Sequence, residues 1–239
     1  MAYIRVAWNL RPCLAEAMGN TRADDAGGRG SRELWLAAAY ESLVEAGVDA
    51  VRIQALGKRV GLSRTSFYWF FQDREALLDA LLDLWREKNS GNLAKQAEAY
   101  AESITEAILN VHDCWLDPSL FDSQFEFAVR SWALQSMGVA AEIEKADSAR
   151  IAALASMFLR FGSSAVSADA RARTIYLTQI GYISMKTRED LATRMRRIPH
   201  YVEVFTGTTP KPRDLARFYA RHSFSPATPE TTRAAEEAA

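Results

Sequence analysis

The sequence of 239 residues is poor in the residues that build covalent cross-links and metal sites. Its two cysteines, Cys13 and Cys114, lie far apart and form no CxxC pair, and its three histidines form no HxxxH pair. A disulfide framework and a zinc site therefore both lack the expected ligand spacing. This cysteine usage fits a reducing cytoplasm, and we expect no metal ion and no other cofactor.

The sequence also lacks long hydrophobic runs and an excess of charge of either sign. No apolar run approaches the roughly 20 residues that span a bilayer, and the first 20 residues are interrupted by Arg5, Asn9 and Arg11, unlike a signal peptide. The formal net charge is -1, so a nucleic-acid partner would have to be met by a local basic patch. We expect a cytoplasmic protein, associated with the nucleoid if it binds DNA.

Catalytic signatures are missing as well. The sequence contains no GxSxG motif, no P-loop and no dinucleotide-binding glycine pattern. His112, Asp113 and Cys114 are adjacent, so a helix would point their side chains in different directions. We therefore expect no enzyme; a helical enzyme that uses Cys114 and His112 remains the alternative, and activity that persists in Cys114→Ser would argue against it.

Helical periodicity dominates what is present. Ser31 can cap a first helix that ends at Gly47. Two short helical segments follow, joined by a turn at Gly61, and Ser63 can cap the second of them. Asp73 can cap a further helix that begins at Arg74 and carries a leucine-rich face.

The later sequence predicts a larger set of helices and no strands. A stripe of Phe121, Phe125, Ala128 and Trp132 is followed by helices over residues 141–161 and 168–185. A further helix over 189–197 is interrupted by Pro199 and resumes toward Phe205, and a short closing helix follows. The predicted fold is all-α. Its domains are a flexible extension (1–30), a helix-turn-helix domain (31–86), a helical bundle (87–224) and a disordered tail (225–239).

Five consecutive aromatic residues, 67–71, raise a specific question, because they cover every face of a helix. Phe67 and Phe71 are one turn apart and suit the core, which leaves Tyr68, Trp69 and Phe70 to point outward. Residues 52–74 contain five basic residues against one acidic residue, a local net charge of +4. A tight turn between two short helices with such a patch indicates a DNA-binding helix-turn-helix.

The segment VRIQALGKRVGLSRTSFYWFFQDREALLDALL resembles the DNA-binding domain of the TetR family of transcriptional repressors, and the resemblance covers residues 31–84. It implies base contacts from the start of the second helix, a phosphate contact from Tyr68, and another from Arg74 at the family's usual lysine position. Gly57 stands where the family usually has alanine. The residues expected to contact DNA are Gln54, Arg64, Thr65, Ser66, Tyr68, Trp69, Phe70 and Arg74; alternatively, residues 64–66 are only a polar helix start.

The resemblance further implies a homodimer and a helical domain that binds a small-molecule effector, here of apolar or aromatic character. Expected pocket residues are Trp115, Phe125, Trp132, Phe158, Phe161 and Tyr176, with Arg130, Gln124 or Gln179 as polar contacts. Each of these aromatic residues alone fits the core better than a pocket, because aromatic stripes usually pack helices together. Expected dimer contacts come from the two long helices, through Ile175, Thr178, Gln179, Tyr182, Ile198, Val202 and Phe205; each of these residues would equally serve as core within the protomer. The implied function is a repressor released from a palindromic operator by its effector; the alternative is an effector-independent architectural or partner-bridging DNA-binding protein.

Overall fold

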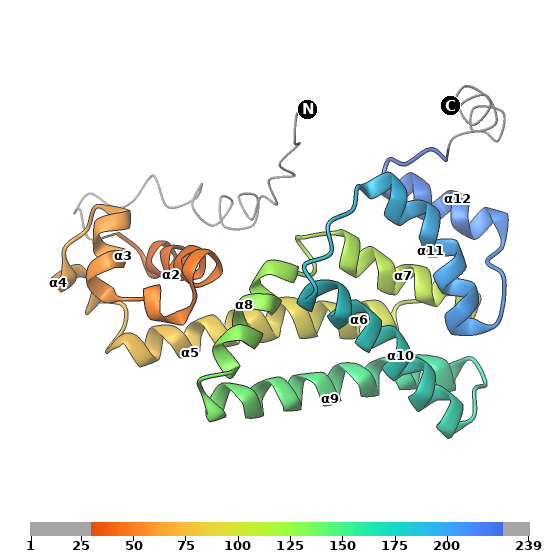
Figure 1. The fold of residues 1–239 in the computed structure, drawn as a ribbon, viewed down its shortest axis with the longest axis horizontal. Helices are drawn as coiled ribbons and strands as arrows, with labels where there is room; N and C mark the ends of the chain where they lie inside the picture. Colours follow the sequence, from red (N-terminus) through yellow and green to blue (C-terminus); the bar gives the residue numbers. More distant parts are fainter. Residues whose placement is uncertain (1–29, 227–239) are drawn as a thin grey trace. The chain divides into compact units, whose positions relative to one another are not determined.

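The computed structural model describes residues 30–226, which are helical throughout apart from turns and connections (Figure 1). The predicted extension and tail lie almost wholly outside these residues, and so does Cys13. The chain divides into two compact units. The first unit consists of two segments, the chain up to Lys95 and Cys114–Ile151. The second unit consists of Gln96–Asp113 and the residues from Ala152 onward. Among the described helices, none is both long enough and apolar enough to cross a membrane.

The first unit begins with the predicted capped helix. Helix α2 runs over Arg32–Ala46, and its first turn is closed by the Ser31 hydroxyl, which accepts a hydrogen bond from the Leu34 N–H at 3.2 Å. Gly47 ends the helix with a φ of 82°, a value that costs glycine little. A short 3-10 turn, η1 (Val48–Ala50), leads to the next helix. Both ends of α2 lie where the sequence predicted them.

The predicted helix-turn-helix is formed by α3 (Ile53–Val60) and α4 (Arg64–Phe67). Gly61 closes α3 in the left-handed conformation with φ 71° and ψ 28°. The Ser63 hydroxyl then caps α4 by accepting from the Ser66 N–H at 3.3 Å. Helix α4 is only four residues long, and the chain continues through the aromatic run as turns.

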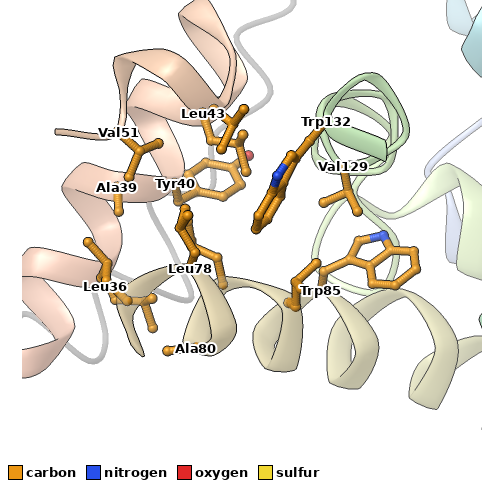
Figure 2. Close-up of a cluster of buried hydrophobic side chains, with 14 of the residues drawn as sticks. Leu36, Ala39, Tyr40, Leu43, Val51, Leu78, Ala80, Trp85, Val129 and Trp132 are labelled. Carbon is orange, nitrogen blue, oxygen red and sulfur yellow. The ribbon is translucent and has the colours of Figure 1, made fainter. Parts of the chain in front are cut away.

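Helix α5 (Arg74–Trp85) packs against α2 and begins at the predicted cap, where Asp73 accepts from the Ala76 N–H at 2.8 Å. Its leucine face joins α2 and α8 (Ser123–Ala133) in one hydrophobic cluster, of which Leu78, Tyr40, Val129 and Trp132 are central members (Figure 2). The ring of Phe125 meets that of Tyr40 edge to face at 4.9 Å. The head, formed by α2, α3, α4 and the start of α5, therefore shares its core with α8.

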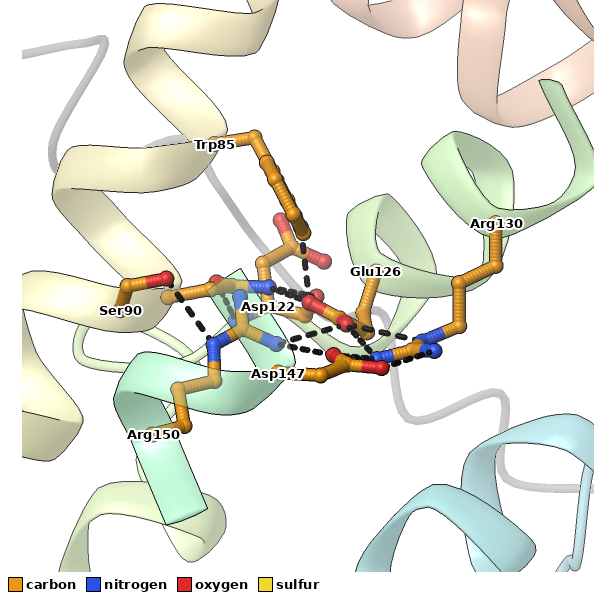
Figure 3. A network of polar contacts seen from close by, with 8 residues as sticks. Trp85, Ser90, Asp122, Glu126, Arg130, Asp147 and Arg150 are labelled. Carbon is orange, nitrogen blue, oxygen red and sulfur yellow. Dashed lines mark hydrogen bonds and ion pairs between the residues drawn. The ribbon is translucent and has the colours of Figure 1, made fainter. Parts of the chain in front are cut away.

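A π-helical segment, η2 (Arg86–Gly91), joins α5 to α6 (Asn92–Glu98). Its buried residue Asn89 takes part in a network of polar groups. Within the first unit, the carboxylate of Glu126 on α8 is fully buried. It accepts from Trp85 Nε1 at 2.7 Å, Asn89 Nδ2 at 2.9 Å, Arg130 Nε at 3.0 Å and Arg150 Nη1 at 2.8 Å (Figure 3). Arg150 lies on α9 (Met137–Arg160), so this carboxylate ties three helices together.

Asp122 forms a second polar junction next to this network. One of its carboxylate oxygens caps α8 by accepting from the Gln124 and Phe125 N–H groups, at 3.0 and 2.9 Å. The other accepts from the Tyr40 hydroxyl at 2.7 Å. Burial, together with this carboxylate, raises the pKa of Tyr40, so the phenol remains a hydrogen-bond donor.

The second unit is built from α7 (Ile104–Leu116), α10 (Ala165–Ser184), α11 (Leu191–Thr206) and α12 (Pro212–Arg221), with the end of α9. The sequence assigned no element to α6 or α7. The predicted interruption at Pro199 was wrong, because α11 runs continuously through it. Proline removes one backbone hydrogen bond, but the buried residues Ile198, Val202 and Phe205 keep the helix in register against its neighbours.

The predicted boundary at residue 86 falls inside the first compact unit, which continues to Lys95 and includes α8 and the first half of α9. The reason lies in the shared core and in the carboxylate networks of Glu126 and Asp122, which join the head to α8.

Candidate nucleic-acid interface

Helix α4 and the turn after it present a pair of exposed polar side chains. Arg64 and Tyr68 are both exposed, and Arg64 donates to the Tyr68 hydroxyl from Nη2 at 2.9 Å and from Nε at 3.3 Å. The guanidinium carbon also lies 5.6 Å from the centre of the Tyr68 ring. Each side chain therefore limits the other's motion, which lowers the entropy lost when a ligand fixes both. Thr65 is exposed beside them.

Ser66 differs from the expectation. Its side chain is buried, and its hydroxyl donates to the Ser63 carbonyl oxygen at 2.7 Å. The hydroxyl thus belongs to the capped first turn of α4, and it faces the head instead of solvent. Because its hydroxyl is buried and bound to the backbone, Ser66 no longer belongs among the expected base contacts.

The aromatic run divides between core and surface as expected from its spacing. Phe67 and Phe71 are buried and stack at 5.5 Å, and Phe67 meets Trp35 edge to face at 5.3 Å. The side chains of Tyr68 and Trp69 are 47% and 67% exposed. Phe70 is only partly exposed, because it packs against the core of the head. Two aromatic rings therefore remain on the surface next to Arg64.

The basic patch is smaller than residue counting indicates. Arg59 forms ion pairs with Glu41, at 3.3 Å, and with Glu45, both on α2. Arg74 uses Nε and Nη2 to donate to the carbonyl oxygens of Val51 and Val48, at 2.6 and 2.8 Å. Arg74 thus holds the connection between α2 and α3, and its guanidinium is only partly free for the expected phosphate contact.

Gln54, at the start of α3, is exposed, and so is Lys58 on the same helix. Both positions are open to a nucleic-acid backbone that runs past the N-terminal half of the helix-turn-helix.

The expected pocket residues fall into two groups. Trp115, Phe125 and Trp132 belong to the first unit, where Phe125 and Trp132 are part of the hydrophobic cluster around α2. Phe158, Phe161 and Tyr176 belong to the second unit, and all but Phe161 are buried. Of the expected polar contacts, Arg130 is bound to Glu126, Gln124 is exposed and Gln179 is buried.

Most of the expected dimer contacts are buried within the protomer. Ile175, Gln179, Ile198, Val202 and Phe205 are all at most 5% exposed, so they form the inner faces of α10 and α11. The exposed apolar side chains of the same helices are others, namely Val166, Leu177, Leu191 and Val204, with Met185 just after α10. These five residues therefore serve as core within the protomer, which is the alternative that the sequence left open.

Comparisons with known proteins agree with this geometry. A family model described as bacterial regulatory proteins of the tetR family matches residues 36–81, which contain the helix-turn-helix. The class G tetracycline repressor protein of Vibrio anguillarum is 33% identical over 76 residues, which is 31% of this chain and 36% of that protein. The class A tetracycline repressor protein from transposon 1721 of Escherichia coli is 34% identical over 61 residues, 26% of this chain and 28% of the relative. The chain therefore matches about a third of the length of these curated relatives.

The overall fold is shared more widely than the sequence. The crystal structure of a protein described as a TetR-family transcriptional regulator from Mesorhizobium loti aligns with 74% of this chain and 95% of its own, with a TM-score of 0.55 and 16% identity. At that identity the likeness concerns the fold alone. The helix-turn-helix segment of this chain, residues 36–81, is thus similar in sequence to bacterial regulatory proteins of the tetR family.

Proposed function

We propose that the protein is a transcriptional regulator, and not an enzyme, that binds double-stranded DNA in the cytoplasm through α4 and the turn after it. The observation that carries the proposal is the exposed Arg64–Tyr68 pair on a helix-turn-helix whose turn is closed by Gly61 and Ser63. An arginine in the major groove can donate to both O6 and N7 of guanine, and a phenol can donate to a phosphate oxygen. Together the two groups supply one reading contact and one positioning contact.

The neighbouring side chains extend this surface. Thr65 is exposed at the start of α4 and suits a base edge, while Trp69 is placed to pack against the sugar-phosphate backbone. The part of Phe70 that stays exposed suits the methyl group of thymine. Gln54 can reach a phosphate from α3. Arg74 adds positive charge near the backbone while it holds two carbonyl groups of the head.

One such surface carries few base contacts, so specificity requires two copies on half-sites about 34 Å apart or a multiple of that spacing. We propose a homodimer on a palindromic operator. The exposed apolar side chains of α10 and α11, in particular Val166, Leu177 and Val204, are the candidates for the contact between copies. Apolar side chains that two copies cover together would be removed from water, which favours such a contact.

The proposed mode is repression relieved by a small molecule. An effector that binds one conformation of the dimer better than the other would shift the spacing of the two heads away from the operator. A difference in binding free energy of about 1–3 kcal/mol between the two conformations is sufficient for such control. The tetracycline repressors matched above align with at most 76 residues of this chain, so they do not identify the effector.

Selection of bound fragments from genomic DNA tests the proposal, followed by affinity measurements on the best fragment. Arg64→Ala and Tyr68→Ala should each weaken binding by roughly tenfold or more, in line with about 1–3 kcal/mol for a specific contact. Lys145→Ala removes one positive charge from an exposed position on α9 and should change the affinity far less. Unchanged duplex affinity in the double variant Arg64→Ala/Tyr68→Ala would refute the proposed interface.

The alternative function, an architectural protein without an effector, makes a different prediction. Such a protein would stay on its site in the presence of every small molecule tried. A shift of the selected fragment from bound to free by one compound, with wild-type protein, would exclude that alternative.

A further inference from the structure

The inner face of α11 carries one charged residue at its N-terminal end. Ile198, Val202 and Phe205 form a buried stripe at helical spacing, and Arg194 stands one turn before Ile198 on that stripe. Its side chain is neither fully buried nor exposed. A cation near the start of a helix also lies at the positive end of the helix dipole, where it is less stable. The position therefore disfavours an arginine on two counts.

The protein supplies Arg194 with little compensation. Its Nη2 donates to Gln179 Oε1 at 3.0 Å, and its guanidinium lies 5.3 Å from the centre of the Tyr182 ring. Among the described residues, no carboxylate lies within 4.0 Å of its nitrogen atoms. Burial lowers the pKa of Arg194, which expresses the cost of keeping this charge away from water. Most of its five N–H donors remain available to an acceptor.

The other ionisable groups nearby leave a positive charge uncompensated. Glu189 uses Oε2 to accept from Arg197 Nη1 at 2.6 Å, and that same Nη1 donates to the Tyr182 hydroxyl at 2.7 Å. Burial and the charge of Arg194 lower the pKa of His112 to about 4, although a hydrogen bond with the Ile108 carbonyl works in the other direction. The imidazole is therefore neutral near pH 7. The positive charges of Arg194 and Arg197 are thus only partly balanced by the single negative charge of Glu189.

A row of ring contacts in the second unit begins at Tyr182, the ring beside the Arg194 guanidinium. The imidazole of His112 stacks on Phe205 at 6.5 Å, Phe205 stacks on Tyr201 at 5.5 Å, and Tyr201 meets Tyr182 edge to face at 6.4 Å. Flat rings beside an unpaired guanidinium suit a ligand with an apolar or aromatic body and one anionic end. A carboxylate matches the geometry of guanidinium, because two parallel N–H donors can meet its two oxygens.

We propose that Arg194 binds the carboxylate of a small organic acid, with the aromatic rings on α7, α10 and α11 next to its apolar part, and that this acid is the effector. The inference rests on the proposed regulatory function and gives the chemical class of the ligand. A purely structural Arg194, which would only support Gln179, is the competing explanation.

Calorimetric titration of the full chain tests the binding, with benzoate and hexanoate as acid probes and benzamide as the neutral counterpart of benzoate. We expect saturable binding of at least one acid, weaker binding of benzamide, and an affinity loss of about tenfold or more in Arg194→Gln. Arg196→Gln is the matched control, since Arg196 is exposed on the same helix and donates to Thr193 Oγ1 at 3.1 Å. Absence of binding by both acids, or equal loss in both variants, would overturn the proposal.

Thermal unfolding without ligand separates a binding role from a structural one. Arg194→Met keeps an unbranched apolar stem and removes the charge. If Arg194 serves to bind a ligand, the unfolding temperature of this variant should equal or exceed that of the wild type. A marked decrease relative to Arg196→Gln would show a structural role and overturn the proposal.

Affinity for the selected DNA fragment then distinguishes this inference from the proposed function. If wild-type protein binds the fragment and neither acid binds the protein, only the effector class is wrong. If an acid binds through Arg194 and no fragment is bound, the site stands and the regulatory function fails.

Discussion

Gly57 is the position in the helix-turn-helix where one added methyl group has the clearest consequence. A Cβ atom there would lie 2.8 Å from the backbone oxygen of Leu62 and 3.6 Å from Cη2 of Trp35. The turn folds back over Gly57, because the Leu62 N–H donates to the Gly57 carbonyl at 2.9 Å and the Gly61 N–H donates to the same oxygen. The obstacle is backbone, which cannot rotate away as the end of a side chain can.

Two opposing effects determine how much Gly57→Ala changes the free energy of unfolding. Alanine is favoured over glycine in a helix by about 1 kcal/mol, and forcing a methyl group into a packed site costs about 1–3 kcal/mol. We expect a net loss of about 1 kcal/mol in the free energy of unfolding, and a decrease in Tm of about 2–4 °C for a chain of this size. The turn would also widen, which displaces Arg64 relative to α3 and weakens DNA binding.

Gly138→Ala is the matched control in the same compact unit. Gly138 lies in α9, and a Cβ atom added there would meet no neighbouring side chain or loop within 4 Å, so alanine should stabilise the protein by up to about 1 kcal/mol. Circular dichroism during urea and thermal unfolding measures both variants, with affinity for the selected fragment as the second measurement. If Gly57→Ala is as stable as Gly138→Ala and binds DNA like the wild type, the turn is not held at this close approach.

Three further predictions concern single groups. His112 has a pKa of about 4 in the folded protein and about 6.5 in the unfolded chain, so the free energy of unfolding should fall by about 3 kcal/mol as the pH decreases from 6.5 to 4. Urea titrations at several pH values should show a weaker pH dependence of this free energy in His112→Asn. Burial alone would raise the pKa of Glu126, but the charges of Arg150 and Arg130 hold it below its usual value. Glu126→Gln should therefore lower the free energy of unfolding by about 3–5 kcal/mol, and the double variant Glu126→Leu/Arg150→Met should recover part of that loss. Arg74→Gln loses two hydrogen bonds to backbone carbonyl groups and should lower the free energy of unfolding by about 1–3 kcal/mol. The salt dependence of DNA binding should change little; a slope of log affinity against log salt concentration that is smaller by about 1 would instead show a phosphate contact.

The sequence predicts those parts of the head that depend on neighbouring residues. Ser31, Ser63 and Asp73 all cap the helices assigned to them, and Gly61 takes the left-handed conformation that ends α3. These features depend on a hydroxyl, a carboxylate or a missing Cβ within a few residues of the backbone they serve. Local chemistry was sufficient for them.

What the sequence could not predict depends on contacts between distant residues. Arg59 adds little net positive charge to the basic patch, because it forms ion pairs with Glu41 and Glu45 on α2. The spacing of residues in the sequence does not reveal these pairs. Periodicity likewise shows that α10 has two faces without showing which one is inside. Leu177 is exposed and Gln179 buried, against the usual preference of both residue types.

The largest difference from the sequence concerns how the head is attached. Tyr40 on α2 donates to Asp122, whose other oxygen caps α8, and Asn89 of the π-helical segment both donates to the Asp122 carbonyl at 3.1 Å and accepts from its N–H at 2.9 Å. One residue thus holds α2, η2 and the start of α8 at once. Because Tyr40, Asn89 and Asp122 are all buried, a shift of α8 would leave a buried polar atom without a partner unless α2 moved with it. The head is therefore held by α8 as well as by α5, and a ligand that displaces α8 would act directly on the helices that we propose to bind DNA.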